Sequence, residues 1–113
     1  FNLFTHNRDD HAKNFSFMLD EKNSWKLTPA YDLTFSYGVG TEHSTTYLNE
    51  GKNPTVNHLE KLALKHGIKE YKQIIDEVKS GILEFPNIEK DVELPKNETV
   101  NLEKIFGELI GKR

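Results

Sequence analysis

Residues 7–17 read NRDDHAKNFSF, and residues 28–33 read TPAYDL. Almost every position in the first half of the longer segment carries an ionisable or amide side chain. Short β-type runs follow at residues 15–19 and 25–27, and the polar residues between them predict the turn of a β-hairpin. The sequence therefore predicts a polar loop of the kind that displays functional groups, followed by a hairpin that leads to a second acidic position at Asp32.

The spacing of the acidic and amide residues indicates phosphoryl transfer. In protein kinases an Asp of the catalytic loop orients the attacking hydroxyl, an Asn after four intervening residues binds magnesium, and a further Asp follows a two-strand turn. Here Asn14 follows Asp9 at that spacing, and Asp32 lies beyond the hairpin. The pattern predicts that Asp9 orients a substrate hydroxyl and that Asn14 and Asp32 supply the hard oxygen ligands that Mg²⁺ prefers.

The rest of the chain is predicted to be helical after an irregular stretch. Residues 34–54 contain three glycines, which predicts a structured loop or a weak second hairpin. From Val56 onward, apolar residues recur at helical spacing. Asn57 and Glu60 are expected to form the capping box of the first helix, and Pro86 is expected to end the second.

These patterns predict one domain over residues 1–113, mainly α with a small β-hairpin region. Residues 1–33 would hold the polar loop, the hairpin and the second Asp, residues 34–54 a loop, and residues 55–113 the helices. A lone two-stranded hairpin is only marginally stable in water, so its apolar side chains are expected to pack on the helices. Those side chains are Phe15, Phe17, Leu19, Trp25 and Leu27.

The composition excludes several classes of site. The chain has 113 residues, 35% of them hydrophobic, a net charge of −3 and no cysteine. It therefore has no disulfide framework and no thiolate metal site, and its charge gives no indication of direct nucleic-acid or membrane binding. No apolar run approaches the roughly 18 residues of a membrane span, and no signal-peptide pattern is present, so we expect a cytoplasmic protein. Residues 1–4 read as the end of an apolar helix, so we expect a fragment of a longer protein.

The two quoted segments resemble the C-terminal motif pair of the HipA family, bacterial serine/threonine kinases that act as toxins of toxin–antitoxin pairs. Residues 42–46 and the helical part resemble that family more loosely. The resemblance implies a truncated kinase-like C-lobe whose parent uses ATP and Mg²⁺ to phosphorylate a protein substrate. It also implies a DNA-binding antitoxin as a partner. No Gly-rich phosphate loop or lysine strand is present, so an N-terminal kinase lobe is expected to supply them, and this fragment alone is expected to be inactive.

The resemblance also assigns roles to single residues. It implies that Asp9 is the catalytic aspartate and that Asn14 and Asp32 are the magnesium ligands. The residues that it places at the nucleotide are His11, Lys13, Asn14, Tyr31 and Asp32. His11 stands where typical eukaryotic kinases carry a lysine, so the site departs there from the common kinase pattern.

The remaining polar residues have less specific interpretations. His6 can take the place of the histidine that holds a kinase catalytic loop. Asp10 is expected either to cap the preceding helix end or to orient His11. The other three histidines are interpreted as surface or packing residues. They are His43, His58 and His66.

Two other functions stay open at the level of sequence. In a metal-dependent hydrolase, Asp9, Asp10, His11 and Asp32 would hold Mn²⁺ or Zn²⁺ and activate a water molecule. In a non-catalytic interaction module, the helical part would bind an antitoxin or another partner protein.

Overall fold

The computed structural model describes residues 1–92 and 94–111 and is mainly α-helical with one β-hairpin, as expected. Its α-helices are α1 Val56–Lys65, α2 Tyr71–Leu83, α3 Phe85–Ile88 and α4 Lys96–Gly111. Its strands are β1 Phe17–Leu19 and β2 Trp25–Leu27. Three short 3-10 turns are also present, η1 Ala12–Asn14, η2 Val39–Thr41 and η3 Glu89–Asp91.

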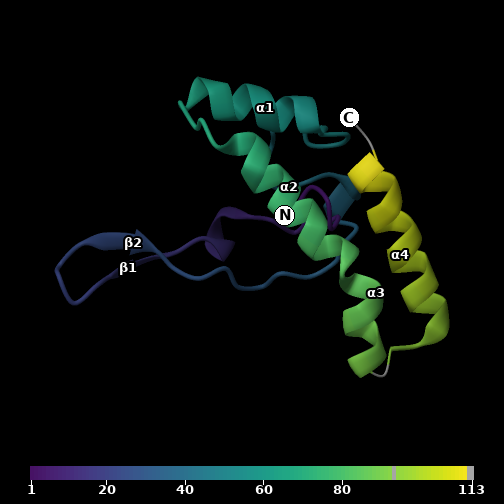
Figure 1. Cartoon of the computed structure of the whole chain (residues 1–113). Helices are drawn as coiled ribbons and strands as arrows, with labels where there is room; N and C mark the ends of the chain where they lie inside the picture. Colours follow the sequence, from purple (N-terminus) through teal and green to yellow (C-terminus); the bar gives the residue numbers. More distant parts are fainter. Residues whose placement is uncertain (93, 112–113) are drawn as a thin grey trace.

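The core forms where the first residues of the chain meet the helices. Leu3 and Phe4 are buried together with Ile82 of α2. The segment that contains them forms hydrogen-bonded turns, with Phe4 N and Thr5 N both donating to Phe1 O, rather than the expected end of a regular helix. Figure 1 shows α2 and α4 side by side, with α1 packed on α2. The side chains that surround this core are Tyr47, Val56, Leu59, Ile75, Val78, Phe106 and Ile110.

The helix boundaries differ from the prediction at two places. The capping box of α1 is made by Thr55 and His58, with Thr55 N donating to His58 Nδ1 at 3.1 Å, and not by Asn57 and Glu60. Pro86 does not end α2, which stops at Leu83. It lies in the first turn of α3, where its missing N–H costs nothing because that position has no intrahelical acceptor.

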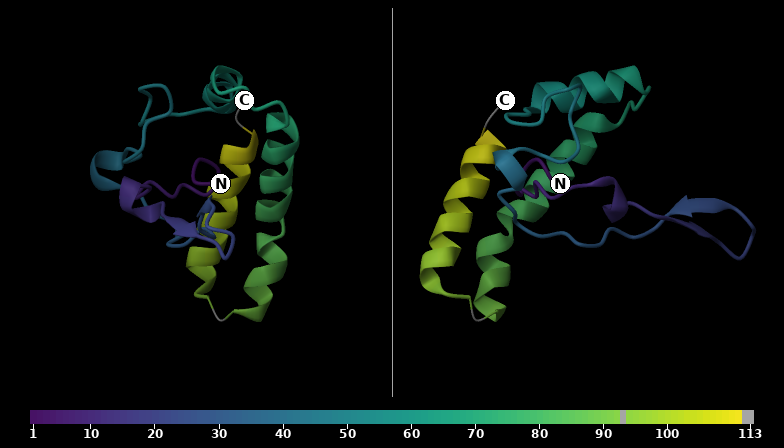
Figure 2. Two further views of the ribbon diagram at one scale, coloured as in Figure 1. Left: turned by 90° about the vertical axis from the view of Figure 1, so that its left-hand side faces the viewer. Right: turned by 180° about the vertical axis from the view of Figure 1, so that it is seen from behind.

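The hairpin extends away from the helices (Figure 1, Figure 2), so the prediction that its apolar side chains pack on them is wrong. The strands are antiparallel, and Phe17 pairs with Leu27 and Leu19 with Trp25. All of these side chains are exposed, Trp25 at 71% and Phe17 at 67%. Both faces of the two-stranded sheet are therefore open to solvent in this chain.

Polar contacts at the turn hold the hairpin closed. The Asp20 carboxylate accepts hydrogen bonds from Lys22 N and Ser24 N, each at 2.9 Å. Its other oxygen lies 2.7 Å from Lys26 Nζ. The bond from Lys26 and then that from Ser24 lower the pKa of Asp20. Because a carboxylate that accepts these bonds must be ionised, we infer that the turn is tightest above the pKa of Asp20.

The glycine-containing stretch that follows wraps around the polar loop. Ser36 N donates to His6 O at 3.1 Å, Arg8 N donates to Ser36 O at 3.3 Å, and Ser44 N donates to Arg8 O at 3.0 Å. The predicted weak hairpin is reduced to a single bridge between Tyr47 and Glu50. This stretch, residues 34–54, therefore forms a collar whose backbone is hydrogen-bonded to the loop.

Among the described residues, no helix combines the length and apolarity needed to cross a membrane.

The collar needs a glycine at position 38. Gly38 has a φ of +71°, and a Cβ at this position would lie 2.7 Å from Arg8 Cβ and still closer to Glu42 O. Gly40 has nearly the same φ, +68°, but no atom lies within 4 Å of the place where its Cβ would stand. Conformational strain is therefore shared by the two positions, and the steric clash is confined to Gly38.

We expect Gly38→Ala to lower the free energy of unfolding by about 3 kcal/mol, because strain and clash add. Gly40→Ala serves as the matched control and should cost about 1 kcal/mol, since it has strain alone. Urea denaturation of the two variants measures the difference. Equal losses would mean that the collar does not lie as closely against Arg8 as the structure shows.

Candidate functional site

The polar loop closes on itself around Asp9. Asn14 ends the short turn η1, in which Asn14 N donates to His11 O at 3.0 Å. The Asn14 side-chain amide reaches back and donates to Asp9 O at 3.0 Å. The Asp9 carboxylate is 56% exposed and lies 4.0 Å from His11 Nε2. The spacing of these residues therefore brings Asn14 against the backbone of Asp9 and leaves the Asp9 carboxylate exposed.

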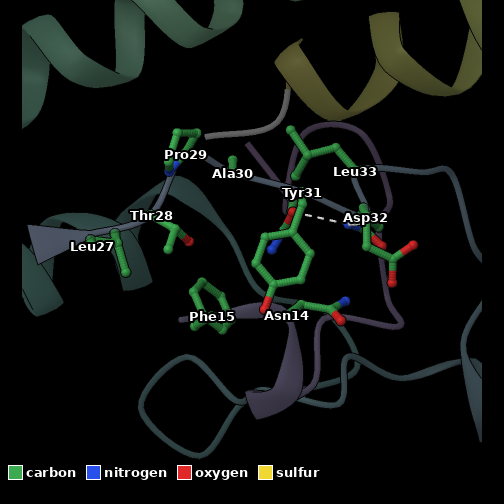
Figure 3. Close-up of a pocket in the computed structure, with 11 residues that line it drawn as sticks. Asn14, Phe15, Leu27, Thr28, Pro29, Ala30, Tyr31, Asp32 and Leu33 are labelled. Carbon is green, nitrogen blue, oxygen red and sulfur yellow. Dashed lines mark hydrogen bonds between the residues drawn. The ribbon is translucent and has the colours of Figure 1, made fainter. Parts of the chain in front are cut away.

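A cavity of about 120 Å³ joins the loop to the segment that returns from the hairpin. Figure 3 shows Asn14 and Phe15 on one side of it, and Tyr31 and Asp32 around the same space. The two residues that the spacing singled out as magnesium ligands, Asn14 and Asp32, thus line one cavity although they are eighteen positions apart.

Tyr31 links the two walls of this cavity. Its hydroxyl donates to Lys13 O at 2.7 Å and lies 2.6 Å from Ser16 Oγ. A phenol has one hydrogen to donate, so Ser16 supplies the hydrogen of the second bond. Tyr31 therefore acts in this chain as a tie between the loop and the returning segment, while the Lys13 side chain stays exposed.

Asn7 holds Asp32 in place, a role that the sequence did not reveal. Its side-chain nitrogen donates to Asn2 Oδ1 at 3.1 Å and to Asp32 O at 3.4 Å, and Asn7 is only 2% exposed. Asp32 has a φ of +54°, a left-handed conformation that is costly for an Asp and needs support from its surroundings. His6, proposed from the sequence as the residue that holds the loop, packs its ring near Phe35 at 5.7 Å between centroids.

Asp10 has a different environment from its neighbour Asp9. It is 1% exposed, its Oδ2 lies 2.9 Å from His43 Nδ1, and its Oδ1 accepts from Thr45 N at 3.0 Å. Tyr47 OH also lies 3.5 Å from Oδ2. Burial, and then the Asp10 charge, raise the pKa of Tyr47 above its ordinary value, because both disfavour the phenolate form.

These contacts correct the expectation for Asp10 and decide between the two interpretations of His43. Asp10 neither caps a helix end nor orients His11, because its carboxylate is bound to His43 and Thr45. Of the two interpretations given for His43, surface or packing, the structure supports packing, since His43 is 6% exposed and paired with a buried carboxylate. Because the Asp10 oxygens are used in this way, they do not join Asp9 and His11 in a hydrolase-type metal cluster. Within residues 1–92 and 94–111, no group of three His, Cys, Asp or Glu side chains could share a metal ion.

The cavity is lined by residue types that could hold a magnesium ion. Mg²⁺ takes few ligands from protein, all of them oxygen, and completes its shell with water and phosphate. The Asn14 amide nitrogen is turned toward Asp9 O, so its carbonyl oxygen is available for a cation. Together with the exposed Asp32 carboxylate, it offers the hard oxygen pair that such an ion requires.

Comparison with known proteins identifies the family of this chain. The model of the family described as HipA-like C-terminal domain matches residues 1–84. Searches of curated proteins and of solved structures gave no match. The matched range contains the polar loop, the hairpin, Asp32, the collar, α1 and α2. Because it covers well over half of the chain, the protein belongs to the family of HipA-like C-terminal domains.

Proposed function

We propose that this chain is the catalytic part of an ATP- and Mg²⁺-dependent serine/threonine protein kinase. The observation that carries the proposal is the contact between Asn14 Nδ2 and Asp9 O beside a cavity that Asn14 shares with Asp32. Asp9, Asn14 and Asp32 are the residue types that phosphoryl transfer to a hydroxyl requires, and the Asp9 carboxylate is exposed to solvent. Membership of a family that consists generally of kinases supports the same conclusion.

Each residue then has a defined part in the reaction. The Asp9 carboxylate accepts a hydrogen bond from the substrate hydroxyl and orients its oxygen toward the γ-phosphorus. As the new P–O bond forms, the bond from that phosphorus to the bridging oxygen breaks, ADP leaves with the bonding electron pair, and Asp9 takes the hydroxyl proton. Asn14 and Asp32 would hold Mg²⁺, which neutralises charge on the phosphates when it is bound. The ammonium of Lys13, which is exposed beside the loop, would offset negative charge on the phosphoryl group.

The exposed hairpin supports the further proposal of an N-terminal lobe that contributes the rest of the ATP site. Four large apolar side chains on two cross-strand pairs have no cover from the helices. Such exposure is unusual for a strand pair and is typical of a surface that another domain or protein covers. The sequence contains no Gly-rich phosphate loop, so the lobe would also supply that element.

The biological setting is proposed from the family alone. We infer a toxin of a bacterial toxin–antitoxin pair, with a DNA-binding antitoxin as partner and a cytoplasmic location. The alternative of a helical module that only binds a partner has no specific contact in its favour.

The first prediction tests the catalytic assignment. In the full-length protein that carries this domain, Asp9→Asn and Asp32→Asn should each reduce phosphoryl transfer from ATP by at least about a thousandfold, since one removes the carboxylate that takes the hydroxyl proton and the other removes the negative charge of a metal ligand. Asp76→Asn, on the exposed face of α2, is the control and should retain full activity. Transfer of labelled γ-phosphate measures the result. Retention of activity by both site variants would exclude the proposed mechanism.

The second prediction concerns Asn7. Replacing it by Ala removes the donor to Asp32 O, so the Mg²⁺ concentration needed for half-maximal transfer should rise by about tenfold or more, as is usual when a residue that supports a metal ligand is lost. Asn57→Ala, on the exposed side of α1, is the matched control. An unchanged Mg²⁺ requirement in a folded Asn7→Ala protein would show that Asp32 needs no such support.

The third prediction tests whether another lobe covers the hairpin. Trp25→Ala should change the unfolding free energy of the isolated chain by less than about 0.5 kcal/mol, because Trp25 is exposed. In the full-length protein the same change should cost about 3 kcal/mol, because it removes a buried Trp. Val39→Ala, at a position that is 95% exposed, should be nearly neutral in both proteins. A small effect of Trp25→Ala in both would mean that the hairpin stays uncovered.

A further inference from the structure

Three successive backbone carbonyls fix the chain on either side of the Asp9 side chain. Arg8 O accepts from Ser44 N at 3.0 Å and from Ser44 Oγ at 3.3 Å. Asp9 O accepts from the Asn14 amide, and Asp10 O accepts from Thr45 Oγ1. The donors on both flanks of Asp9 therefore come from the collar, at positions 44 and 45. The placement of Asp9 depends on where those two residues lie.

The collar is in turn held by the buried Asp10 carboxylate. One oxygen accepts from Thr45 N, and the other lies 2.9 Å from the His43 ring nitrogen. A carboxylate can only accept, so His43 Nδ1 carries the hydrogen of this bond. The two side chains are each 2% exposed, and a charge buried to that extent is tolerated only when its hydrogen-bonding partners are all in place. The pair thus couples position 10 of the loop to positions 43 and 45 of the collar.

The far side of His43 is also fixed. Its backbone N donates to Gly51 O at 2.8 Å, and its ring packs edge-on against Tyr47 with centroids 5.2 Å apart. Tyr47 points its hydroxyl toward the same Asp10 oxygen. His43 therefore cannot follow Asp10 freely if the loop moves, and the pair transmits the position of the collar to the loop.

We propose that Asp10 and His43 form a positioning pair that sets the catalytic geometry of Asp9 without touching substrate. This inference rests on the proposed function. Loss of Asp10 leaves Thr45 N and His43 Nδ1 without their common acceptor. Loss of His43 leaves one oxygen of the buried Asp10 carboxylate without its hydrogen-bond donor. The loop that carries Asp9 then shifts relative to the cavity, and a displacement of about 1 Å at a reacting group costs on the order of a hundredfold in rate.

The experiment compares variants of the pair in the full-length protein, at a temperature where near-UV circular dichroism shows each to be folded. Asp10→Ala and His43→Leu should each lower kcat by about a hundredfold, with KM for ATP within about twofold, because neither residue contacts the nucleotide in the proposed site. The double variant should be no worse than the more impaired single variant, since the two residues act as one unit.

A conservative variant separates positioning from mere structural support. His43→Asn keeps an N–H donor close to the position of Nδ1, so it should retain kcat within about fivefold of the wild type and well above His43→Leu. Leu59→Ala, in the core contact of α1, is the control for destabilisation: it should lower the melting temperature while kcat stays unchanged.

The outcomes distinguish this inference from the proposed function. If the wild type transfers no phosphate, or if Asp9→Asn remains active, the kinase assignment fails and the positioning role fails with it. If transfer depends on Asp9 but Asp10→Ala and His43→Leu keep kcat within about threefold of the Leu59→Ala control, the positioning pair alone is refuted. A loss that falls on KM instead of kcat, or a His43→Asn variant as impaired as His43→Leu, also refutes it.

Discussion

The hydrogen bonding of the buried Asp10 carboxylate to the collar is the interaction on which the rest of the polar site depends. A carboxylate removed from water needs hydrogen-bond donors around it, and here these come from the collar at positions 43, 45 and 47. The collar contains no long helix, and besides Asp10 it is bonded to the loop through the backbone of His6 and Arg8 and through the Arg8 side chain. The buried Asp10 carboxylate therefore acts together with these bonds to hold an irregular segment in a fixed position against the loop.

The apolar part of the molecule supports this polar part rather than enclosing it. Leu3 and Phe4 are buried against α2, and the polar loop begins directly after them. Phe4, Asn7 and Asp10 are the most deeply buried of the large side chains described, and they are spaced three positions apart. The same short segment thus enters the core through Phe4, reaches Asp32 through Asn7 and reaches the collar through Asp10. Rigid anchoring on three sides explains how a loop with an exposed Asp9 can have a defined shape.

Features that depend on residues close together in the sequence could be predicted, whereas contacts between distant positions could not. The hairpin, the three longer helices and the approach of Asn14 to Asp32 all follow from spacing within about twenty residues. The Asp10–His43 pair joins positions 33 residues apart. Asp and His are both common on protein surfaces, so the sequence gives no sign that these two are buried and paired. The helix cap was misplaced because Asn57 with Glu60 fits the capping pattern better than Thr55 with His58 does. The hairpin was expected to be covered because its residues are apolar, but a sequence does not say whether the cover lies in the same chain.

The adjacent Asp9 and Asp10 show that residue type alone does not assign a role. Both are carboxylates on one loop, yet Asp9 is more than half exposed and Asp10 is almost completely buried. An exposed carboxylate keeps its lone pairs for an incoming hydroxyl, whereas a buried one must use them on protein donors to remain charged. Asp10 is adjacent to Asp9 in the chain, so fixing the Asp10 side chain also fixes the backbone from which the Asp9 side chain extends. In the proposed kinase the two carboxylates therefore have different roles: Asp10 uses its charge to hold the loop in place, and Asp9 keeps its charge for the substrate hydroxyl.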